Sequence, residues 1–233
     1  MQAQRSTHIV FSTGCTPYFD WQSLGLAHSH ASVRQYGKIT RLVSQCADDA
    51  ARARSLQLPH MSTHEHPDFG VPAGNGVDDV YPQYNKPAGI VHWLAARAAH
   101  KASTAGGAAA HTSADRHPRR GTPRRAADEA DFVLLLESDM LMRAPIDCGA
   151  LGVRPGRAAS ARYEYLKGAS NGMARQFVKN VHLVQPVGGW VCLHKDDLAR
   201  VAPLWLDLAK QVRARQGNKA FLDHTTTHST LAT

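Results

Sequence analysis

The sequence is poor in cysteine and has no long apolar run. Its four cysteines, Cys15, Cys46, Cys148 and Cys192, form no Cys-x-x-Cys pair, which argues against zinc-ribbon and thioredoxin-like proteins and leaves the pairing of any disulfides open. No stretch has the roughly 20 apolar residues that a membrane helix needs, and Met1–Thr7 is not a signal peptide. Two explanations stay open: a soluble cytosolic protein, or a fragment whose targeting segment lies outside this sequence.

Aromatic residues are also few, 7% of the chain, and none lies in its most basic segment. Seven Lys or Arg and one acid, Asp115, lie between Arg97 and Arg125, so this segment supplies +6 of the net charge of +8. A basic patch without aromatic side chains has nothing on which nucleic-acid bases stack, so no nucleic-acid partner is expected. The remainder, at +2, has the near-neutral balance of an enzyme domain.

The basic segment belongs to a low-complexity insertion. Ala102–Ala127 is rich first in Ala, Gly, Ser and Thr and then in Arg and Pro, a composition that predicts disorder. The chain length of 233 residues and the 43% hydrophobic content suffice for one large α/β domain or two small ones. We expect a single domain over residues 1–233, with the insertion at about 102–127 and an atypical tail at 222–233.

The first third of the chain predicts a β-α-β unit. His8–Thr13 and Ile39–Ser44 have the composition of strands, and Asp20 is placed to cap a helix that runs to about Tyr36. Such a unit crosses over right-handed into a parallel sheet. Leu56–Pro82 is rich in His, Pro, Gly and Asp without steady periodicity, and we expect a long surface loop there.

Alternating strands and helices continue through the rest of the chain. A helix is expected from Pro87 to about His100, and a final helical region begins at Asp196 or Asp197 and restarts at Pro203. Three further strands are expected: Phe132–Leu136, Ala158–Tyr165 and, at an edge of the sheet, Trp190–Leu193. The alternation indicates an α/β fold with a mixed sheet.

A buried strand that ends in two carboxylates is the strongest local signal of chemistry. Phe132–Leu136 is a continuous apolar run followed by Glu137 and Asp139, and ligands bind beyond the carboxyl ends of parallel strands. Alternation along a strand directs both carboxylates to one side, where they suit a hard divalent cation whose shell is completed by substrate phosphates and waters. The motif alone favours the simpler alternative, an ordinary polar strand end.

The histidines do not form a recognisable metal motif. His64 and His66 flank Glu65 without the spacing of a zinc-protease helix, so a loop is the better interpretation. His224 and His228 stand four apart in a Thr-rich tail, and chain tails rarely form a helix.

Six blocks of residues occur in a fixed order between His8 and Phe221. They are His8–Cys15 with Tyr18–Gln22, Ile39–Leu42, Tyr81–Pro87 through Trp93 and Leu94, Glu137–Asp139 with Pro145, Pro186–Gly189, and Lys195–Leu198 to Ala202–Trp205. In this order they resemble the plant and green-algal peptide O-glycosyltransferases, which comprise hydroxyproline O-arabinosyltransferases and peptidyl serine α-galactosyltransferases. Each block alone is weak, and their common order makes the resemblance specific.

The two branches of this group are not separated by the sequence. Phe19–Gln22, Asn85–Gly89 and Ala202–Leu206 look more like the serine galactosyltransferases. Glu137 and Lys195–Asp197 look more like the arabinosyltransferases. The donor sugar therefore stays open between arabinofuranose and galactose.

The resemblance implies a GT-A-like nucleotide-binding fold, with a mixed, mostly parallel central sheet flanked by helices. It implies transfer of a sugar from a UDP-sugar donor, with Mn²⁺ or another divalent cation, to hydroxyproline or serine in Hyp/Ser-rich polypeptides such as extensin-like cell-wall glycoproteins. It also implies work in the Golgi or endoplasmic reticulum, with a membrane anchor in full-length relatives that is absent from this chain. Retention of the anomeric configuration by the group is compatible with a front-face reaction that needs no enzymic base.

Candidate site residues follow from the resemblance and the pattern together. Asp139 is expected to bind the metal directly, with Glu137 completing the shell or bonding the donor ribose. Nucleotide or donor contacts are expected from Ser12, Thr13, Asn85, Lys86, Gly188 and Gly189. The alternatives are ordinary strand-end hydrogen bonding for Ser12 and Thr13, helix capping by Asn85, and a tight turn at Gly188 and Gly189. No nucleophile or general base is identified.

The end of the chain departs from the group. After the position of Phe221 the group continues with Gly-Trp and a Glu-Met-Tyr stretch, whereas Leu222–Thr233 is different. A third metal ligand, often His, is expected from this late region, and His224 is a substitute by residue type alone. We therefore expect a C-terminally truncated fold, and a catalytically inactive fragment is the alternative function.

Overall fold

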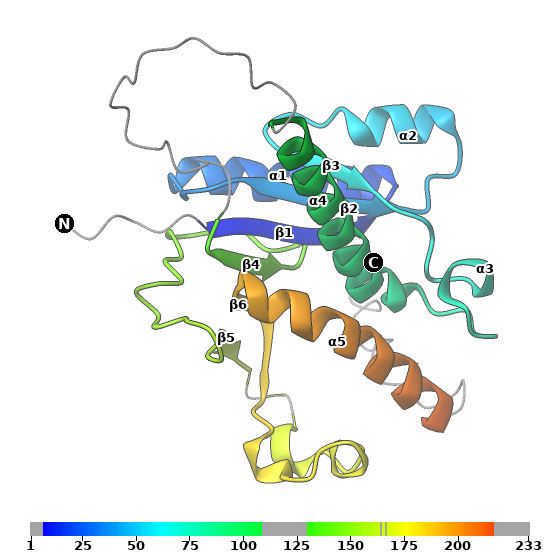
Figure 1. Cartoon of the computed structure of the whole chain (residues 1–233), viewed down its shortest axis with the longest axis vertical. Coiled ribbons are helices and arrows are strands. Elements are labelled where there is room, and N and C mark those ends of the chain that lie inside the picture. Colours follow the sequence, from blue (N-terminus) through cyan, green and yellow to red (C-terminus); the bar gives the residue numbers. More distant parts are fainter. Residues whose placement is uncertain (1–6, 109–129, 164, 166, 217–233) are drawn as a thin grey trace, which may run out of the picture.

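The chain is described here from a computed structural model that defines residues 7–108, 130–163, 165 and 167–216 (Figure 1). Its centre is a six-stranded sheet with the order β3-β2-β1-β4-β6-β5. The strands are β1 Thr7–Gly14, β2 Ile39–Ser44, β3 Ser62–Glu65, β4 Phe132–Leu136, β5 Ala159–Arg162 and β6 Val187–His194. The neighbours among β1 to β4 are parallel, and β6 runs antiparallel to both β4 and β5.

Helices cover both faces of this sheet. The α-helices are α1 Pro17–Ser32, α2 Asp49–Leu56, α3 Pro72–Asn75, α4 Asn85–Ala108 and α5 Lys195–Gln216. Short 3₁₀ turns are η1 Pro82–Tyr84, η2 Gly168–Ser170, η3 Ala174–Gln176 and η4 Val181–Leu183. The predicted α/β fold with a mixed, mostly parallel sheet and flanking helices is confirmed.

Alternation along the strands divides the core into two layers. Ile9 and Leu134 pack with Leu26 of α1 on one face. Val10 packs on the other face with Trp93 of α4 and Leu198 of α5, and these two helices lie against each other there (Figure 1). Because burial of one such side chain contributes about 1.5–3 kcal/mol, β1 and β4 are fixed from both sides.

Three expectations about the secondary structure were wrong. The cap of α1 is Thr16, whose Oγ1 accepts from the amide of Phe19 at 3.5 Å, so Asp20 lies inside the helix. The segment 56–82 is more than a loop, because it contains β3 and α3. The expected edge strand is instead an inner one, since β6 pairs with β4 and β5. The β3 strand consists of polar residues, Ser62–Glu65, and so gave no apolar signal.

Two helices are longer than expected. α4 continues to Ala108, into the segment expected to be disordered, and α5 runs without interruption through Pro203. The basic Arg116–Arg125 patch and the tail with His224 and His228 lie outside the described residues.

Two disulfides join segments that lie far apart in the sequence. Cys15 pairs with Cys46, which links the ends of β1 and β2. Cys148, in the loop after β4, pairs with Cys192 of β6. Across the described residues, no helix has both the length and the apolar character needed to cross a bilayer.

Candidate functional site

Strands β1 to β4 are parallel, so their carboxyl ends meet at one edge of the sheet, the carboxyl edge. The residues expected from the sequence gather at this edge from four elements. β1 supplies Ser12 and Thr13, the start of α4 supplies Asn85 and Lys86, the turn after β4 supplies Glu137 and Asp139, and the start of β6 supplies Gly188 and Gly189.

The two carboxylates lie in a tight turn, the acid turn, made by residues 137–140. β4 ends at Leu136, and the amide of Met140 donates to the carbonyl of Glu137 at 3.3 Å. Alternation along a strand therefore does not extend to these residues. Between the two acids, buried Ser138 donates through Oγ to Gln22 of α1 at 2.9 Å. This bond fixes the acid turn to α1 and leaves Asp139 exposed.

Lys86 of α4 forms an ion pair with Glu137. Its ammonium also lies 5.8 Å from the ring centroid of Trp205 on α5. The Glu137 side chain is 45% exposed, so the pair stays open to solvent and to ligands. Among the described residues Asp139 forms no ion pair, which leaves it as the carboxylate of the acid turn that is available for a cation.

Thr13 is held by a buried arginine. Its Oγ1 accepts from Nε of Arg41 at 2.7 Å, and the same guanidinium donates to the carbonyl of Gly14 at 3.0 Å and to Asp20 at 2.8 Å. Arg41 has no exposed surface. These bonds fix the backbone at the end of β1. The Thr13 side chain is therefore used as an acceptor for Arg41, whereas the partly exposed Ser12 takes no part in these bonds.

Asp20 is the acceptor at the centre of these contacts. Besides Arg41 it accepts from Arg54 at 2.8 Å and from Ser55 at 2.9 Å. Burial raises the pKa of Asp20, and the three hydrogen bonds together outweigh burial and hold the pKa below its usual range. We call Thr13, Asp20, Arg41, Arg54 and Ser55 the Arg41 network. Sequence analysis missed it, although an arginine inside an apolar strand was a usable signal.

Asn85 also has internal partners. Its Oδ1 accepts from the amide of Phe69 at 2.7 Å, and its Nδ2 donates to Asp68 at 2.8 Å. These bonds fasten the preceding loop to the start of α4. Neither bond caps α4 itself, so the capping alternative is not what the structure shows.

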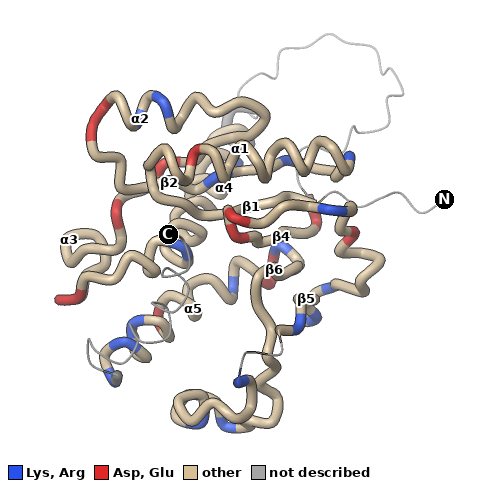
Figure 2. The backbone as a smooth tube through the Cα atoms, turned by 180° about the vertical axis from the view of Figure 1, so that it is seen from behind, with Lys and Arg blue, Asp and Glu red and all other residues tan. Residues whose placement is uncertain are grey.

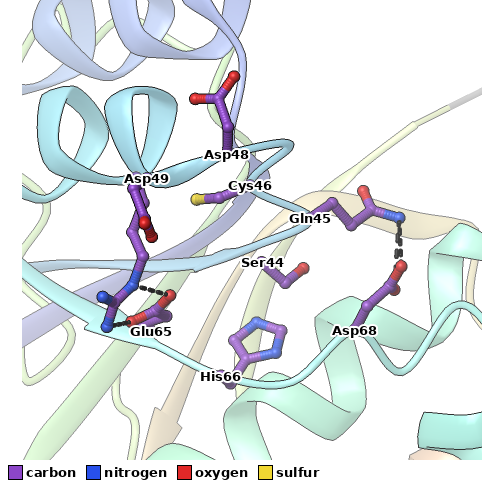
Figure 3. Close-up of a pocket in the computed structure, with 9 residues that line it drawn as sticks. Ser44, Gln45, Cys46, Asp48, Asp49, Glu65, His66 and Asp68 are labelled. Carbon is purple, nitrogen blue, oxygen red and sulfur yellow. Dashed lines mark hydrogen bonds and ion pairs between the residues drawn. The ribbon is translucent and has the colours of Figure 1, made fainter.

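A cavity of about 600 Å³ opens beside the carboxyl edge at the ends of β2 and β3 (Figure 3). Four acids line it, Asp48, Asp49, Glu65 and Asp68. Arg52 neutralises one of them, because its Nε and Nη2 each lie 2.6 Å from the Glu65 carboxylate. The sequence did not predict this cavity, because its lining combines the segment 44–52, for which no site was expected, with Glu65, His66 and Asp68 of the expected loop.

A divalent cation fits the acid turn by ligand type but not by ligand number. Carboxylate oxygens are the ligands of hard cations, and such cations often take one or two protein carboxylates beside substrate phosphates. Within residues 7–108, 130–163, 165 and 167–216, no group of three or more His, Cys, Asp or Glu is arranged to hold a metal ion. Glu137 and Asp139 therefore supply two candidate ligands, and the rest would have to come from substrate and water.

Comparison with known proteins found similar sequences and weaker structural likenesses. No protein-family model matches the chain. It is 36% identical over 214 residues to a peptidyl serine alpha-galactosyltransferase of Arabidopsis thaliana. It is 30% identical over 218 residues to one of Chlamydomonas reinhardtii. These matches cover 89% and 88% of this chain but only 22% and 25% of the relatives.

Solved structures of the galactosyltransferase LgtC also match. One, in complex with donor and acceptor sugar analogues, has 14% identity and a TM-score of 0.48 over 88% of this chain and 66% of that chain. A second, of an active-site mutant of LgtC, has 14% identity and a TM-score of 0.46 over 88% of this chain and 65% of that chain.

Proposed function

We propose that this chain, whose resemblance to the plant and green-algal peptide O-glycosyltransferases is confirmed by both relatives, is the donor-binding part of such an enzyme. The proposed reaction moves a sugar from a UDP-sugar to a hydroxyl of a Hyp/Ser-rich polypeptide. The single observation that carries the proposal is the carboxyl edge, where Lys86, Glu137 and Asp139 converge from two elements. Both relatives bear the serine galactosyltransferase name, which favours galactose and serine over arabinofuranose and hydroxyproline.

The charges at this edge suit a nucleotide diphosphate. Asp139 is the proposed direct ligand of Mn²⁺ or another divalent cation, with Glu137 completing the shell or bonding the ribose. When bound, such a cation neutralises the diphosphate as the bond to the anomeric carbon breaks. Lys86 adds a positive charge from the start of α4, where exposed backbone amides also favour anions. Its ion pair with Glu137 holds the ammonium at the edge until phosphate oxygens replace or share that carboxylate.

The disulfides support a secretory location. Cys15–Cys46 and Cys148–Cys192 are both formed, and such bonds persist in the oxidising lumen of the secretory pathway and are rare in the cytosol. We propose the Golgi or endoplasmic reticulum as the site of action. Thiol labelling of the protein taken directly from cells checks this, and two free thiol pairs would contradict it.

The test combines a donor screen with a binding measurement. UDP-galactose and UDP-arabinofuranose are offered to Ser-containing and Hyp-rich peptides, with Mn²⁺ present. Asp139→Ala is expected to lower turnover about a hundredfold or more, a loss typical of removing one electrostatic stabiliser. The matched control is Asp196→Ala, a 73% exposed acid at the opposite end of β6, which should leave turnover unchanged. An active Asp139→Ala enzyme would refute the metal assignment.

Thermal shift separates an enzyme from an inactive fragment of the same fold. UDP with Mn²⁺ should raise the melting temperature, because a ligand that binds only the folded state stabilises it. A shift without turnover on any peptide identifies a binding domain. An unchanged melting temperature would refute the proposed donor site.

A further inference from the structure

Gly189 at the start of β6 is glycine for a reason the sequence did not reveal. Its φ is +73°, a conformation that side chains rarely adopt. A Cβ atom at this position would overlap Oη of Tyr163, and it would lie 2.6 Å from Cε2 and 2.7 Å from Cζ of the same ring. The space above Gly189 is therefore occupied by the hydroxyl end of the Tyr163 ring, and the glycine serves to admit that ring.

The backbone around Tyr163 aims its side chain at this spot. The β5–β6 pairing shifts register between Ser160 and Ala161, and such irregularities re-aim side chains and are frequent beside active sites. After the shift, the amide of Tyr163 donates to the carbonyl of Pro186 at 2.8 Å. The ring of Tyr165, a 72% exposed residue, lies 5.3 Å away at an angle of 31°.

The course of β6 places this ring at the carboxyl edge. Leu135 pairs with Val191 in the antiparallel β4–β6 ladder. From Val191 back to Val187, β6 extends past the last residue of β4, Leu136, on the side where the acid turn begins. The ring on Gly189 therefore lies at the same edge of the sheet as the residues that the proposed donor site uses.

The Tyr163 hydroxyl is a polar group without a protein partner. The side chain is half-buried, and within the part of the chain that the structure describes its Oη makes no hydrogen bond. Buried tyrosine hydroxyls usually have such a partner, whereas this half-buried one is not among the buried polar atoms that lack a partner. The Tyr163 hydroxyl is therefore open to water or to a ligand at the edge that holds the candidate site.

We propose that Tyr163 contacts the sugar of the donor, with its ring against the C–H face of the sugar and its hydroxyl on a sugar hydroxyl. The inference rests on the proposed function and adds the residue that recognises the sugar. The acid turn and Lys86 are proposed to face the diphosphate instead. Tyr163 is thus a specificity residue that the nucleotide alone does not reach.

Binding of UDP and of intact UDP-sugar to the same variants tests this. Tyr163→Phe keeps the ring that fits Gly189 and removes only the hydroxyl. It should weaken UDP-sugar binding about fivefold, the worth of about one hydrogen bond, and leave UDP binding unchanged. Tyr36→Phe is the matched control, because Tyr36 is 61% exposed in the loop that leads into β2, at the opposite edge of the sheet. Calorimetry with both ligands, in Mn²⁺, measures the two affinities.

The outcomes separate this inference from the function beneath it. If Tyr163→Phe binds UDP-sugar as tightly as the unmodified protein, the sugar contact is refuted while the donor site stands. If both ligands weaken together and the melting temperature falls, Tyr163 has a packing role and the inference is again refuted. If the unmodified protein binds neither ligand, the proposed function fails first.

Discussion

The sheet consists of two regions of opposite character. In the parallel region, which consists of β1 to β4, three strands have no exposed residue. Arg41 of β2 forms a buried ion pair with Asp20 of α1. The antiparallel region, residues 157–194, has buried side chains in β6 only at Cys192 and Leu193. It also carries five Lys or Arg against one acid, Glu164, and Figure 2 shows this basic tract along β5 and beyond.

The two regions therefore have different roles at the candidate site. The parallel region fixes the backbone at the carboxyl edge through burial from two sides and through the Arg41 network. The antiparallel region brings Tyr163 and Gly189 to that edge with little core of its own and with a positive charge that favours an anionic ligand. We expect changes in the parallel region to cost more stability than changes in the antiparallel region.

Removal of the buried guanidinium should have the largest effect. Arg41→Ala leaves Asp20 in the core without its fully buried partner, and loss of one member of a buried pair costs about 3–5 kcal/mol. Urea unfolding measures the loss. Arg52→Ala is the control within the same region, because the Arg52–Glu65 pair is exposed and such pairs contribute little. Equal urea unfolding midpoints for the two variants would mean that the buried Arg41 network contributes no more stability than the exposed Arg52–Glu65 pair.

A substitution at Gly189 should have an intermediate effect that reveals the ring above it. Gly189→Ala meets both an unfavourable φ and the Tyr163 ring, and the strain of such a conformation alone is about 1–3 kcal/mol. Gly156→Ala is the matched control, because Gly156 has φ +79° and nothing within 4 Å of an added Cβ. The excess loss in thermal unfolding at Gly189 measures the clash. No excess would mean that the ring moves away freely.

Acidification should produce the smallest effect, and it acts through His64 of β3 and His66 directly after it. Burial, reinforced by neighbouring histidines, lowers the pKa of His64 and His66 from 6.5. The unfolded chain then binds more protons than the folded one below pH 6.5, so stability falls as the pH is lowered past that value. The low pKa of Asp20 adds a loss only below about its ordinary 3.8.

Thermal unfolding between about pH 7.5 and about pH 5.0 measures this dependence. His64→Gln should reduce it, because the glutamine does not titrate while His66 still does. An unchanged slope in that variant would assign the pH dependence to other groups, such as His66 or His30 of α1, whose pKa values are also lowered by burial.

Some elements were readable from sequence and others were not, for a physical reason. β1, β2 and β4 were predicted within a residue, because all three have the composition of strands, although only β4 is a continuous apolar run. β3 was missed because the exchange of backbone hydrogen bonds with β2, and not its polar side chains, holds it in the sheet. Glu137 and Asp139 were singled out because they directly follow an apolar run. The turn that holds them was not predicted, since strand alternation was expected to continue through both acids.

The sequence by itself determined the buried strands, the position of the two acids after β4 and the resemblance to the glycosyltransferase group, because these depend on the local order of residues. Only the tertiary structure decided which side chains meet. Lys86 and Glu137 are 51 residues apart, and Cys148 and Cys192 are 44 apart. Such contacts, like that of Tyr163 with Gly189, depend on the order and register of strands, and those are set by the packing of the whole sheet.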